Sequence, residues 1–480
     1  MDRKRLALLA AIMGSFVAGL DSTVVNVALP AIERDLGGGL AGQQWVSNAY
    51  LLTLGSLILI GGSLGDVFGE RRIFSLGVAG FGVASLLCAI SPTIEVLVAA
   101  RALQGVFGAL LTPSALAVII AAFPPSERGA AIGSWTAWTG IAFVVGPLAG
   151  GLIVDNVSWR WIFALNIPFV AATLMLVAAA VKERPRGETH VAVDWWGALL
   201  CALGLAGPVY ALVRQPDKGW GSSEVLIPLL AGLAFFAAFL WRESRIRNPM
   251  LPLGLFRRRN FTIGNIETLA MYGGLSMSSF VLVLFLQEVA GYSAVDSGLA
   301  TVPITLVMFS LSKEVGRLAD RYGPRRFMGF GPIVAGCGLL LYQRVGRDAS
   351  YVTEVLPAVV VFALGLSMTV APLTATVLAD ADDRNAGIAS GINNAIARVA
   401  ALLAVAVVGL IAGKAITLAG FHHVMLLGGV LVIGAGVLGL AGIRDPGRDV
   451  HCADCPGGAL AGAPLEALPE LQLPEPAGAT

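Results

Sequence analysis

Charged residues are scarce in this chain. Asp, Glu, Lys and Arg make up 13% of its 480 residues, whereas ordinary soluble domains hold about 25%. Hydrophobic residues reach 56%. A soluble protein has no core large enough for so many apolar side chains, so the composition predicts a protein embedded in lipid. The net charge of +1 gives no indication of a nucleic-acid partner, and none is expected.

Motifs for ATP hydrolysis and for hydrolytic catalysis are missing as well. The sequence has no P-loop pattern G-x-x-x-x-G-K-S/T and no Ser-His-Asp or metal-protease arrangement. We therefore expect no enzyme and no cofactor.

The five cysteines do not form a disulfide framework. Three lie in apolar segments and are expected to pack there: Cys88, Cys201 and Cys337. The run His451-Cys452-Ala-Asp-Cys455 is a single C-x-x-C, and no second pair completes the four ligands of structural zinc. We expect no metal there, with a site shared in a dimer or redox chemistry as the alternatives.

Long hydrophobic segments account for most of the chain. Each has about 20 residues, the length that crosses the hydrocarbon core of a bilayer. The fourteen predicted spans are 6–30, 43–65, 72–91, 94–122, 130–154, 160–181, 194–213, 222–241, 259–289, 295–315, 326–342, 353–379, 387–412 and 420–442. The fold class is therefore an all-α integral membrane protein.

The distribution of Lys and Arg predicts the orientation. With the N-terminus and its Arg3, Lys4 and Arg5 in the cytoplasm, most basic residues of the turns fall on the cytoplasmic side. An even number of spans returns the C-terminus to that side, so we expect a multi-pass protein of the cell membrane with both termini in the cytoplasm. A cleaved signal peptide over 1–30 is disfavoured, because the segment holds Asp21 and has no clear cleavage site.

One eleven-residue pattern, G-x-L-x-D-x-x-G-x-R-R, occurs once in each half of the chain. All six fixed positions are identical in 62–72 and 316–326. Each copy lies between two long apolar segments, which indicates two related halves of the kind that rock about a central site to move a solute. The polar and glycine positions are Gly62, Asp66, Gly69, Arg71, Arg72, Gly316, Asp320, Gly323, Arg325 and Arg326.

These repeats divide the chain into four parts. Residues 1–181 and 259–442 are predicted to be six-helix halves, and 182–258 an inserted two-helix hairpin with flanking basic loops. The loop 242–258 predicts a short amphipathic stretch at 249–256 on the membrane surface. The remainder, 443–480, is rich in Pro, Ala, Gly and acids and is predicted to be a disordered cytoplasmic tail.

The duplicated pattern resembles the loop motif of the major facilitator superfamily, and other segments resemble its fourteen-span drug:proton antiporters. Four segments carry this likeness together with the loop motif: 20–30 (LDSTVVNVALP), 101–105 (RALQG), 159–168 (WRWIFALNIP) and 286–293 (LQEVAGYS). Span 5 holds Gly146, Pro147, Gly150 and Gly151, similar to the antiporter motif G-x-x-x-G-P-x-x-G-G, although Ala142 replaces its first glycine.

The resemblance implies a major facilitator fold and roles for two of these motifs. The repeated loop would act as a conformational latch, and its aspartates can also simply cap the following helix. The glycines of span 5 would form a leak-preventing seal. On physical grounds alone they indicate only a bent, closely packed helix.

Two carboxylates lie within predicted spans and are the candidates for proton coupling. Asp21 and Arg101 lie at about 13 and about 10 Å from the outer ends of spans 1 and 4, so contact is possible. A site that alternates between wet and dry, with a guanidinium beside the carboxylate, can bind and release a proton. The alternative is a static ion pair that braces the two spans.

Glu267 and Arg398 suggest a similar pair in the second half. They lie about 10 and about 16 Å from the cytoplasmic side, in spans 9 and 13. Functional and structural roles are both open for them. The candidates for a substrate cavity are Asn26, Gln104, Trp135, Trp138, Asn393 and Asn394. The tryptophans can equally pack against lipid, and the two last asparagines can satisfy donors of Arg398.

The sequence thus predicts a proton-coupled secondary transporter that exports lipophilic or antibiotic-like compounds by alternating access. Its expected partners are a small-molecule substrate, protons and lipid, and it is expected to be a monomer. The same residues also fit an alternative, a proton-coupled metabolite transporter of narrow substrate specificity that works as an exporter or an importer. A non-transporting membrane sensor on the same fold is another.

Overall fold

The computed structural model describes residues 2–181, 193–246, 249–379 and 386–445. Over these residues every regular element is a helix, as expected for segments in lipid, where a helix satisfies all its own backbone groups. Contacts separate residues 444–480 from a first unit, residues 1–443, which holds all the described helices. Most of the predicted tail, from 446 onward, lies outside the described residues.

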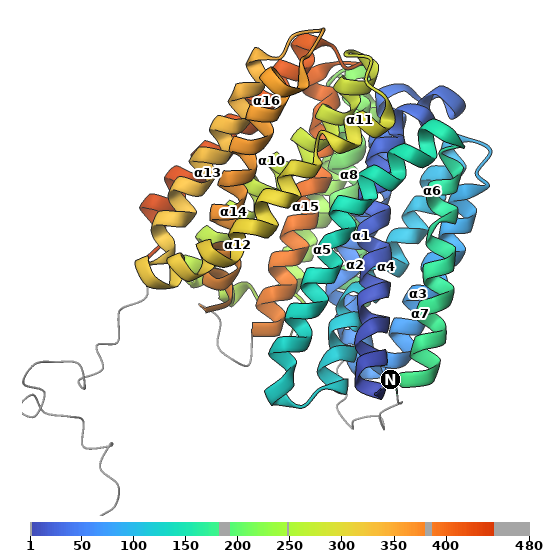
Figure 1. Cartoon of the computed structure of the whole chain (residues 1–480), viewed down its shortest axis with the longest axis vertical. Coiled ribbons are helices and arrows are strands. Elements are labelled where there is room, and N and C mark those ends of the chain that lie inside the picture. The colour runs from blue at the N-terminus through green and yellow to red at the C-terminus, as the bar shows by residue number, and fades with distance from the viewer. Residues whose placement is uncertain (1, 182–192, 247–248, 380–385, 446–480) are drawn as a thin grey trace, which may run out of the picture. The chain divides into compact units, whose positions relative to one another are not determined.

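The first half of the unit contains the helices α1 to α7, which can be followed from blue to green in Figure 1. They are α1 (Arg3–Leu36), α2 (Gly39–Phe68), α3 (Glu70–Ala89), α4 (Ile94–Ala122), α5 (Pro125–Asn156), α6 (Arg160–Ala164) and α7 (Asn166–Ala180). The hairpin that follows consists of α8 (Trp195–Lys218) and α9 (Ser223–Glu243).

The second half begins after the short 3-10 helix η1 (Leu253–Arg257). Its elements are α10 (Arg259–Glu288), α11 (Ala294–Leu299), α12 (Val302–Tyr322), α13 (Pro324–Leu341), η2 (Tyr342–Arg344), η3 (Tyr351–Val355), α14 (Leu356–Ala379), α15 (Ala386–Ala412) and α16 (Leu418–Gly442).

All fourteen predicted spans fall on these helices, and thirteen helical segments of the described chain are long and apolar enough to cross a membrane. The fourteenth, α13, is less apolar because Arg325 and Arg326 lie in its first turn. Two predicted spans are interrupted: 160–181 is split into α6 and α7, and 295–315 into α11 and α12.

The two halves repeat one packing pattern. In the first half α4 packs on α2 and α3, and α7 packs on α1 and α3. In the second half α14 packs on α12 and α13, and α16 packs on α10 and α13. The halves meet at two equivalent places: α2 packs on α15, and α5 packs on the interrupted span formed by α11 and α12. The α8–α9 hairpin lies outside this contact, with α8 against α2 and α15. The sequence repeat is thus a structural repeat.

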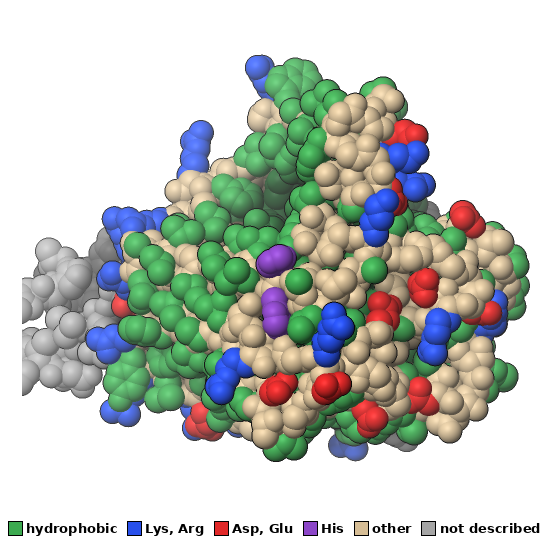
Figure 2. Space-filling model, turned by 90° about the horizontal axis from the view of Figure 1, so that it is seen from above, with side chains coloured by type: hydrophobic (Ala, Val, Ile, Leu, Met, Phe, Trp, Pro, Cys, Tyr) green, Lys and Arg blue, Asp and Glu red, His purple; other side chains and the backbone are tan. Residues whose placement is uncertain are grey.

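We call the end of the unit at which α1 begins the basic end, and the opposite end the far end; Figure 2 views the far end, where acidic and basic side chains are scattered. Several hydrogen bonds join the halves at the far end. Gln43 on α2 donates to Glu288 on α10 at 2.7 Å, and Gln287 on α10 donates to the carbonyl of Val27 on α1 at 2.9 Å. The far end is therefore closed by polar contacts between the halves.

The loop before α10, predicted to hold an amphipathic stretch at 249–256, contains η1. Its Leu255 is buried with Phe261 and Met328 of the second half. The backbone N–H of Leu251 also donates to the carboxyl of Glu243 at 2.8 Å. Apolar side chains of this connection therefore pack on the second half, and its predicted place on the membrane surface stays a prediction.

Candidate functional site

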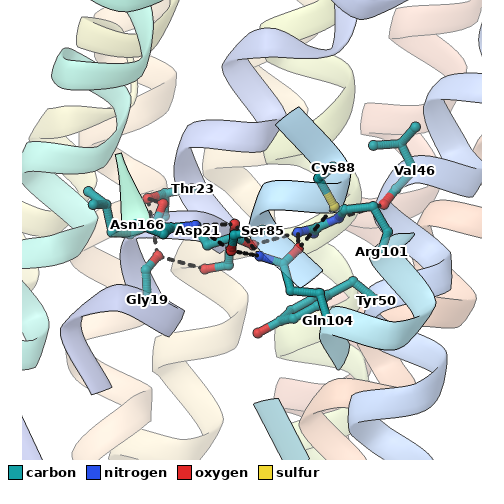
Figure 3. A network of polar contacts seen from close by, with 12 residues as sticks. Gly19, Asp21, Thr23, Val46, Tyr50, Ser85, Cys88, Arg101, Gln104 and Asn166 are labelled. Carbon is teal, nitrogen blue, oxygen red and sulfur yellow. Dashed lines mark hydrogen bonds and ion pairs between the residues drawn. The ribbon is translucent and has the colours of Figure 1, made fainter. Parts of the chain in front are cut away.

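Asp21 lies on α1 at the centre of a polar network drawn from five helices, α1, α2, α3, α4 and α7 (Figure 3). Its Oδ2 accepts a hydrogen bond from Arg101 on α4 at 2.5 Å. Its Oδ1 accepts from Gln104 on α4 at 2.8 Å and from Asn166 on α7 at 2.9 Å. The carboxylate thus accepts three hydrogen bonds, an arrangement that stabilises an ionised acid away from water.

Arg101 has partners on every side. Besides Asp21 it donates to the amide oxygen of Gln104 at 2.6 Å and to the carbonyl of Val46 on α2 at 3.2 Å. Its guanidinium lies 4.5 Å from the ring centroid of Tyr50, a cation–π contact. The side chains of Arg101 and Asp21 are 2% and 1% exposed, so this ion pair is sealed from solvent in the present conformation.

The contact predicted between Asp21 and Arg101 is therefore formed, but two further members of the network were missed. Asn166 opens α7, and Ser85 on α3 accepts hydrogen bonds from Gln104 at 2.9 Å and from Asn166 at 3.2 Å. Asn166 belongs to the run WRWIFALNIP, so a signal was present, but it carried no information about which helix face the side chain occupies.

The other residues predicted around Asp21 have different surroundings. Gln104 is fully buried in the network and lines no open space. Asn26 is half-buried. Trp135 on α5 donates to the Ser15 hydroxyl on α1 at 2.9 Å, whereas the Trp138 side chain is 56% exposed. Trp135 therefore links α1 and α5 in this state.

The pairing predicted between Glu267 and Arg398 is not formed. Within the described residues neither carboxyl oxygen of Glu267 has a hydrogen-bond partner, although the residue is fully buried. A Cβ built on Gly439 of α16 would lie 2.1 Å from Glu267 Oε1, so the carboxyl abuts that helix. A buried, unpaired carboxylate is costly, so Glu267 is expected to be uncharged here.

Arg398 is half-buried in the middle of α15 and lies beside the first half. A Cβ built on Gly55 of α2 would lie 3.3 Å from Arg398 Cβ. One turn away, Asn394 is exposed and donates to the Ser390 carbonyl at 3.1 Å. Asn393 instead donates to Asn265 and Thr268 on α10, at 3.1 and 2.7 Å. Within the described residues, neither asparagine accepts a hydrogen bond from Arg398.

The duplicated loop motif forms two equivalent turns. Gly69 joins α2 to α3 with φ 93° and ψ 134°, and Gly323 joins α12 to α13 with φ 88° and ψ 143°. Each donates its N–H to the carbonyl four residues earlier, at 2.9 Å. Side chains with a Cβ rarely adopt this conformation, which explains a glycine at both positions.

The charged residues of the motif differ in their contacts and exposure. Arg325 donates to the Leu440 carbonyl at 2.7 Å and so ties the start of α13 to the end of α16. Asp320 and Arg326 are exposed, as is Arg72, whereas Arg71 is half-buried. The side chain of Asp66 lies outside the described part of the structure.

The glycines of α5 allow close approach of two neighbouring helices. A Cβ at Gly146 would lie 2.0 Å from Thr23 Oγ1 on α1, and one at Gly150 would lie 2.9 Å from Val24. A Cβ at Gly151 would lie 2.5 Å from Val295 Cα on α11, in the other half. The carbonyl of Pro147 faces α11 in the same way, because a Cβ at Gly298 would lie 2.6 Å from its oxygen.

No cluster of three or more His, Cys, Asp or Glu suited to a metal occurs in the described residues. The predicted tail cluster His451, Cys452 and Cys455 lies outside them.

A bundle of apolar helices built from two repeated halves, with an ionisable network buried between helices, defines a multi-pass membrane transporter. The chain belongs to the major facilitator superfamily, whose family model matches residues 11–405.

Curated relatives and solved structures agree with this assignment. The chain is 36% identical to the puromycin resistance protein pur8 of Streptomyces alboniger over 84% of this chain and 81% of the relative. It is 34% identical to the tetracenomycin C resistance and export protein of Streptomyces glaucescens, over 84% and 75%. It is 35% identical to the multidrug resistance protein Stp of Mycobacterium tuberculosis, over 85% and 76%.

Among solved structures, the D-xylose-proton symporter shares 15% identity with a TM-score of 0.66 over 92% of this chain and 98% of that one. A POT family transporter in complex with a thioalcohol-conjugated peptide shares 14% identity with a TM-score of 0.70, over 91% and 95%. At this identity the likeness shows the fold alone.

Proposed function

We propose that this protein is a proton-coupled exporter of antibiotic-like small molecules, working as a monomer in the cell membrane by alternating access. The observation that carries the proposal is the buried network around Asp21, a titratable group on a helix that contacts the second half. The resistance and export functions in the names of its relatives support the class of substrate. The basic end is assigned to the cytoplasm by the distribution of Lys and Arg.

Asp21 is the primary proton site. In the conformation closed at the far end it is ionised, because Arg101, Gln104 and Asn166 all donate to it. Opening of the far end admits water and protons, and protonation removes the charge that holds Arg101 in place. The network then relaxes, which changes the relative energies of the two orientations. Closing restores the three donors and expels the proton toward the cytoplasm.

Glu267 is a second candidate proton carrier. Its uncharged form suits the apolar surroundings in which it lies, so it holds a proton in this conformation. It must reach water in another conformation to release that proton. Its position against α16, away from the Asp21 network, makes it a separate site whose contribution is measured by proton stoichiometry.

The loop turns at Gly69 and Gly323 and the glycine face of α5 set the conformational equilibrium. The turns hold charged residues at the basic end, where contacts between the halves act as a latch. The close packing of α5 on α11 seals the far end, because backbone lies against backbone and leaves no room for water.

Proton flux in proteoliposomes tests the proposal. Purified protein is reconstituted with an internal pH dye and an imposed pH gradient, then given puromycin, tetracenomycin C and a panel of neutral and charged lipophilic compounds. We expect one or more compounds to collapse the gradient, and Asp21→Asn to reduce this flux at least tenfold.

Asp35→Asn is the matched control. Asp35 lies on the same helix at the far end, where it pairs with Arg160 at the surface, and such pairs contribute little. The control is expected to keep full flux. Undiminished substrate-dependent proton flux in Asp21→Asn would remove Asp21 from the mechanism. If none of the compounds produced a proton flux, the exporter assignment would be rejected.

A further inference from the structure

A polar stripe on α15 runs from the basic end to the middle of the membrane. Ser390, Asn394 and Arg398 are spaced by four residues, so they share one face of the helix. Asn394 is exposed, and Ser390 and Arg398 are half-buried. Polar side chains at this depth do not face lipid, so the stripe faces the space between the halves.

The neighbours of the stripe on α2 confirm its direction. A Cβ built on Gly391 would lie 3.3 Å from Leu59 Cδ2, and one on Gly55 would lie 3.3 Å from Arg398 Cβ. Both contacts are with the first half. α15 packs on α2 of the first half and on α10 of the second, and the charge of Arg398 acts on Tyr50 and Tyr272 of these two helices. The stripe thus ends at Arg398, where helices of both halves meet.

The charge at this point is uncompensated. Arg398 forms no ion pair or hydrogen bond with another described residue, in contrast to Arg101, which neutralises Asp21. Glu267 abuts α16, and its carboxyl forms no hydrogen bond with a described residue. Asp21 and Arg101 compensate each other, so among these four ionisable groups Arg398 is the cation without a described counter-ion.

We propose that Arg398 is a specificity-determining residue that binds the acidic group of an anionic aromatic substrate, with Ser390 and Asn394 forming its approach path. A guanidinium without a protein partner is suited to a carboxylate or phenolate, which it can bind through two parallel hydrogen bonds. The half-buried ring of Tyr272 on α10 offers a flat surface to an aromatic ring system, whereas Tyr50 is buried beneath Arg101. The ligand class is an aromatic acid rather than a lipophilic cation, which Arg398 repels.

This inference rests on the proposed export function, but binding to purified protein tests it without proton coupling. Two dyes on one ring system serve as probes: fluorescein, an anion at neutral pH, and a rhodamine ester, a cation. Fluorescence anisotropy measures the affinity of each for the wild type, Arg398→Gln and Arg398→Lys. Thermal melting checks that each variant is folded.

The wild type is expected to bind fluorescein at least tenfold more tightly than the rhodamine ester. Arg398→Gln is expected to weaken fluorescein binding by about ten- to a hundredfold, the range for loss of hydrogen bonds to a charged group. Arg398→Lys keeps the charge but loses the two parallel hydrogen bonds, so its affinity for fluorescein is expected to lie between those of the wild type and Arg398→Gln. Arg347→Gln removes a positive charge from an exposed loop and is expected to change nothing.

Three results overturn the inference: tighter binding of the cation in the wild type, unchanged fluorescein affinity in Arg398→Gln, or equal losses in Arg398→Gln and Arg347→Gln. None of them affects the export proposal, which depends on Asp21. Conversely, binding of fluorescein that depends on Arg398, without any substrate-driven proton flux, keeps the binding site and rejects the exporter.

Discussion

Asp155, in the last turn of α5, accepts the backbone N–H of Val295, at the start of α11, at 2.9 Å across the boundary between the two halves. Its other carboxyl oxygen accepts the N–H of Ala294 at 3.1 Å. Directly beneath, Gly151 lets α5 touch the same backbone. One carboxylate therefore holds the far end closed at the point where the glycine face of α5 meets the second half.

Asp155→Ala is expected to increase the open fraction of the far end by about three- to tenfold, because two hydrogen bonds to a carboxylate are lost from an exposed position. The measurement is the rate at which a membrane-impermeant maleimide labels Ala294→Cys, in a background with the native cysteines replaced. Asp296→Asn is the control, since Asp296 bonds only within its own turn, to Ser293. If Ala294→Cys were labelled at the same rate with and without Asp155→Ala, Asp155 would not hold the far end closed.

Asn166 is expected to hold the Asp21 carboxylate in position for proton exchange. Asn166→Ala removes one of the three donors to this carboxylate, so substrate-driven proton flux should fall by about tenfold, the range for loss of one hydrogen bond to a charged group. Asn156→Ala, an exposed asparagine at the end of α5, should leave the flux unchanged. Undiminished flux in Asn166→Ala would mean that the bond from Asn166 to Asp21 has no part in transport.

The sequence could predict the contact between Asp21 and Arg101 because their depths along α1 and α4 are similar. The same depth estimate failed for Glu267 and Arg398, because depth does not say which face of a helix a side chain occupies. Glu267 abuts α16, and Arg398 lies on α15, which corresponds to α5 in the repeat and not to α4. Asn166 was missed for the same reason. Apolar length and the duplicated motif, by contrast, predict the spans and the repeat, since both are linear properties.

Glu267→Gln is expected to fold normally and to reduce the number of protons exchanged per substrate. The amide has the same shape as the neutral carboxyl, so the melting temperature should stay close to that of the wild type. Gly439→Ala provides the contrast. Its new methyl group would lie 2.1 Å from Glu267 Oε1 and 2.6 Å from the Met328 carbonyl oxygen, so it should destabilise the protein by about 1–3 kcal/mol.

Calibrated proton and substrate fluxes give the stoichiometry, and melting gives the stability. An unchanged ratio of protons to substrate in Glu267→Gln would leave Asp21 as the proton site and make Glu267 a packing residue.

Gly69→Ala and Gly323→Ala should each lower stability by about 1–2 kcal/mol, because both glycines have a positive φ that a side chain disfavours. Gly62→Ala and Gly316→Ala are matched controls from the same motif. A Cβ at either position meets its nearest atom at 3.8 Å, an ordinary contact. Thermal melting should therefore separate the two pairs, and equal melting temperatures would show that the turns tolerate another backbone conformation.

The hairpin α8–α9 is anchored at its basic end by Asp194, which caps α8 through the Gly197 N–H at 2.9 Å and pairs with Arg242 of α9 at 2.8 Å. Burial alone would raise the pKa of Asp194, but the hydrogen bonds and charge of Arg242 and the Gly197 N–H outweigh it and hold that pKa below its usual value. The ion pair and cap therefore stabilise the fold whenever Asp194 is ionised.

Asp194→Asn should cost about 1–3 kcal/mol at pH 7. Because the folded pKa is depressed, this contribution is complete above the unfolded pKa, about 3.9, and is lost as the pH falls through the folded value. The difference in melting temperature between wild type and variant in mild detergent should therefore shrink on acidification. Asp217→Asn, at the other end of α8 in an exposed pair with Lys414, should have little effect at any pH. A difference that stays constant down to the lowest pH would mean that the charge of Asp194 contributes nothing.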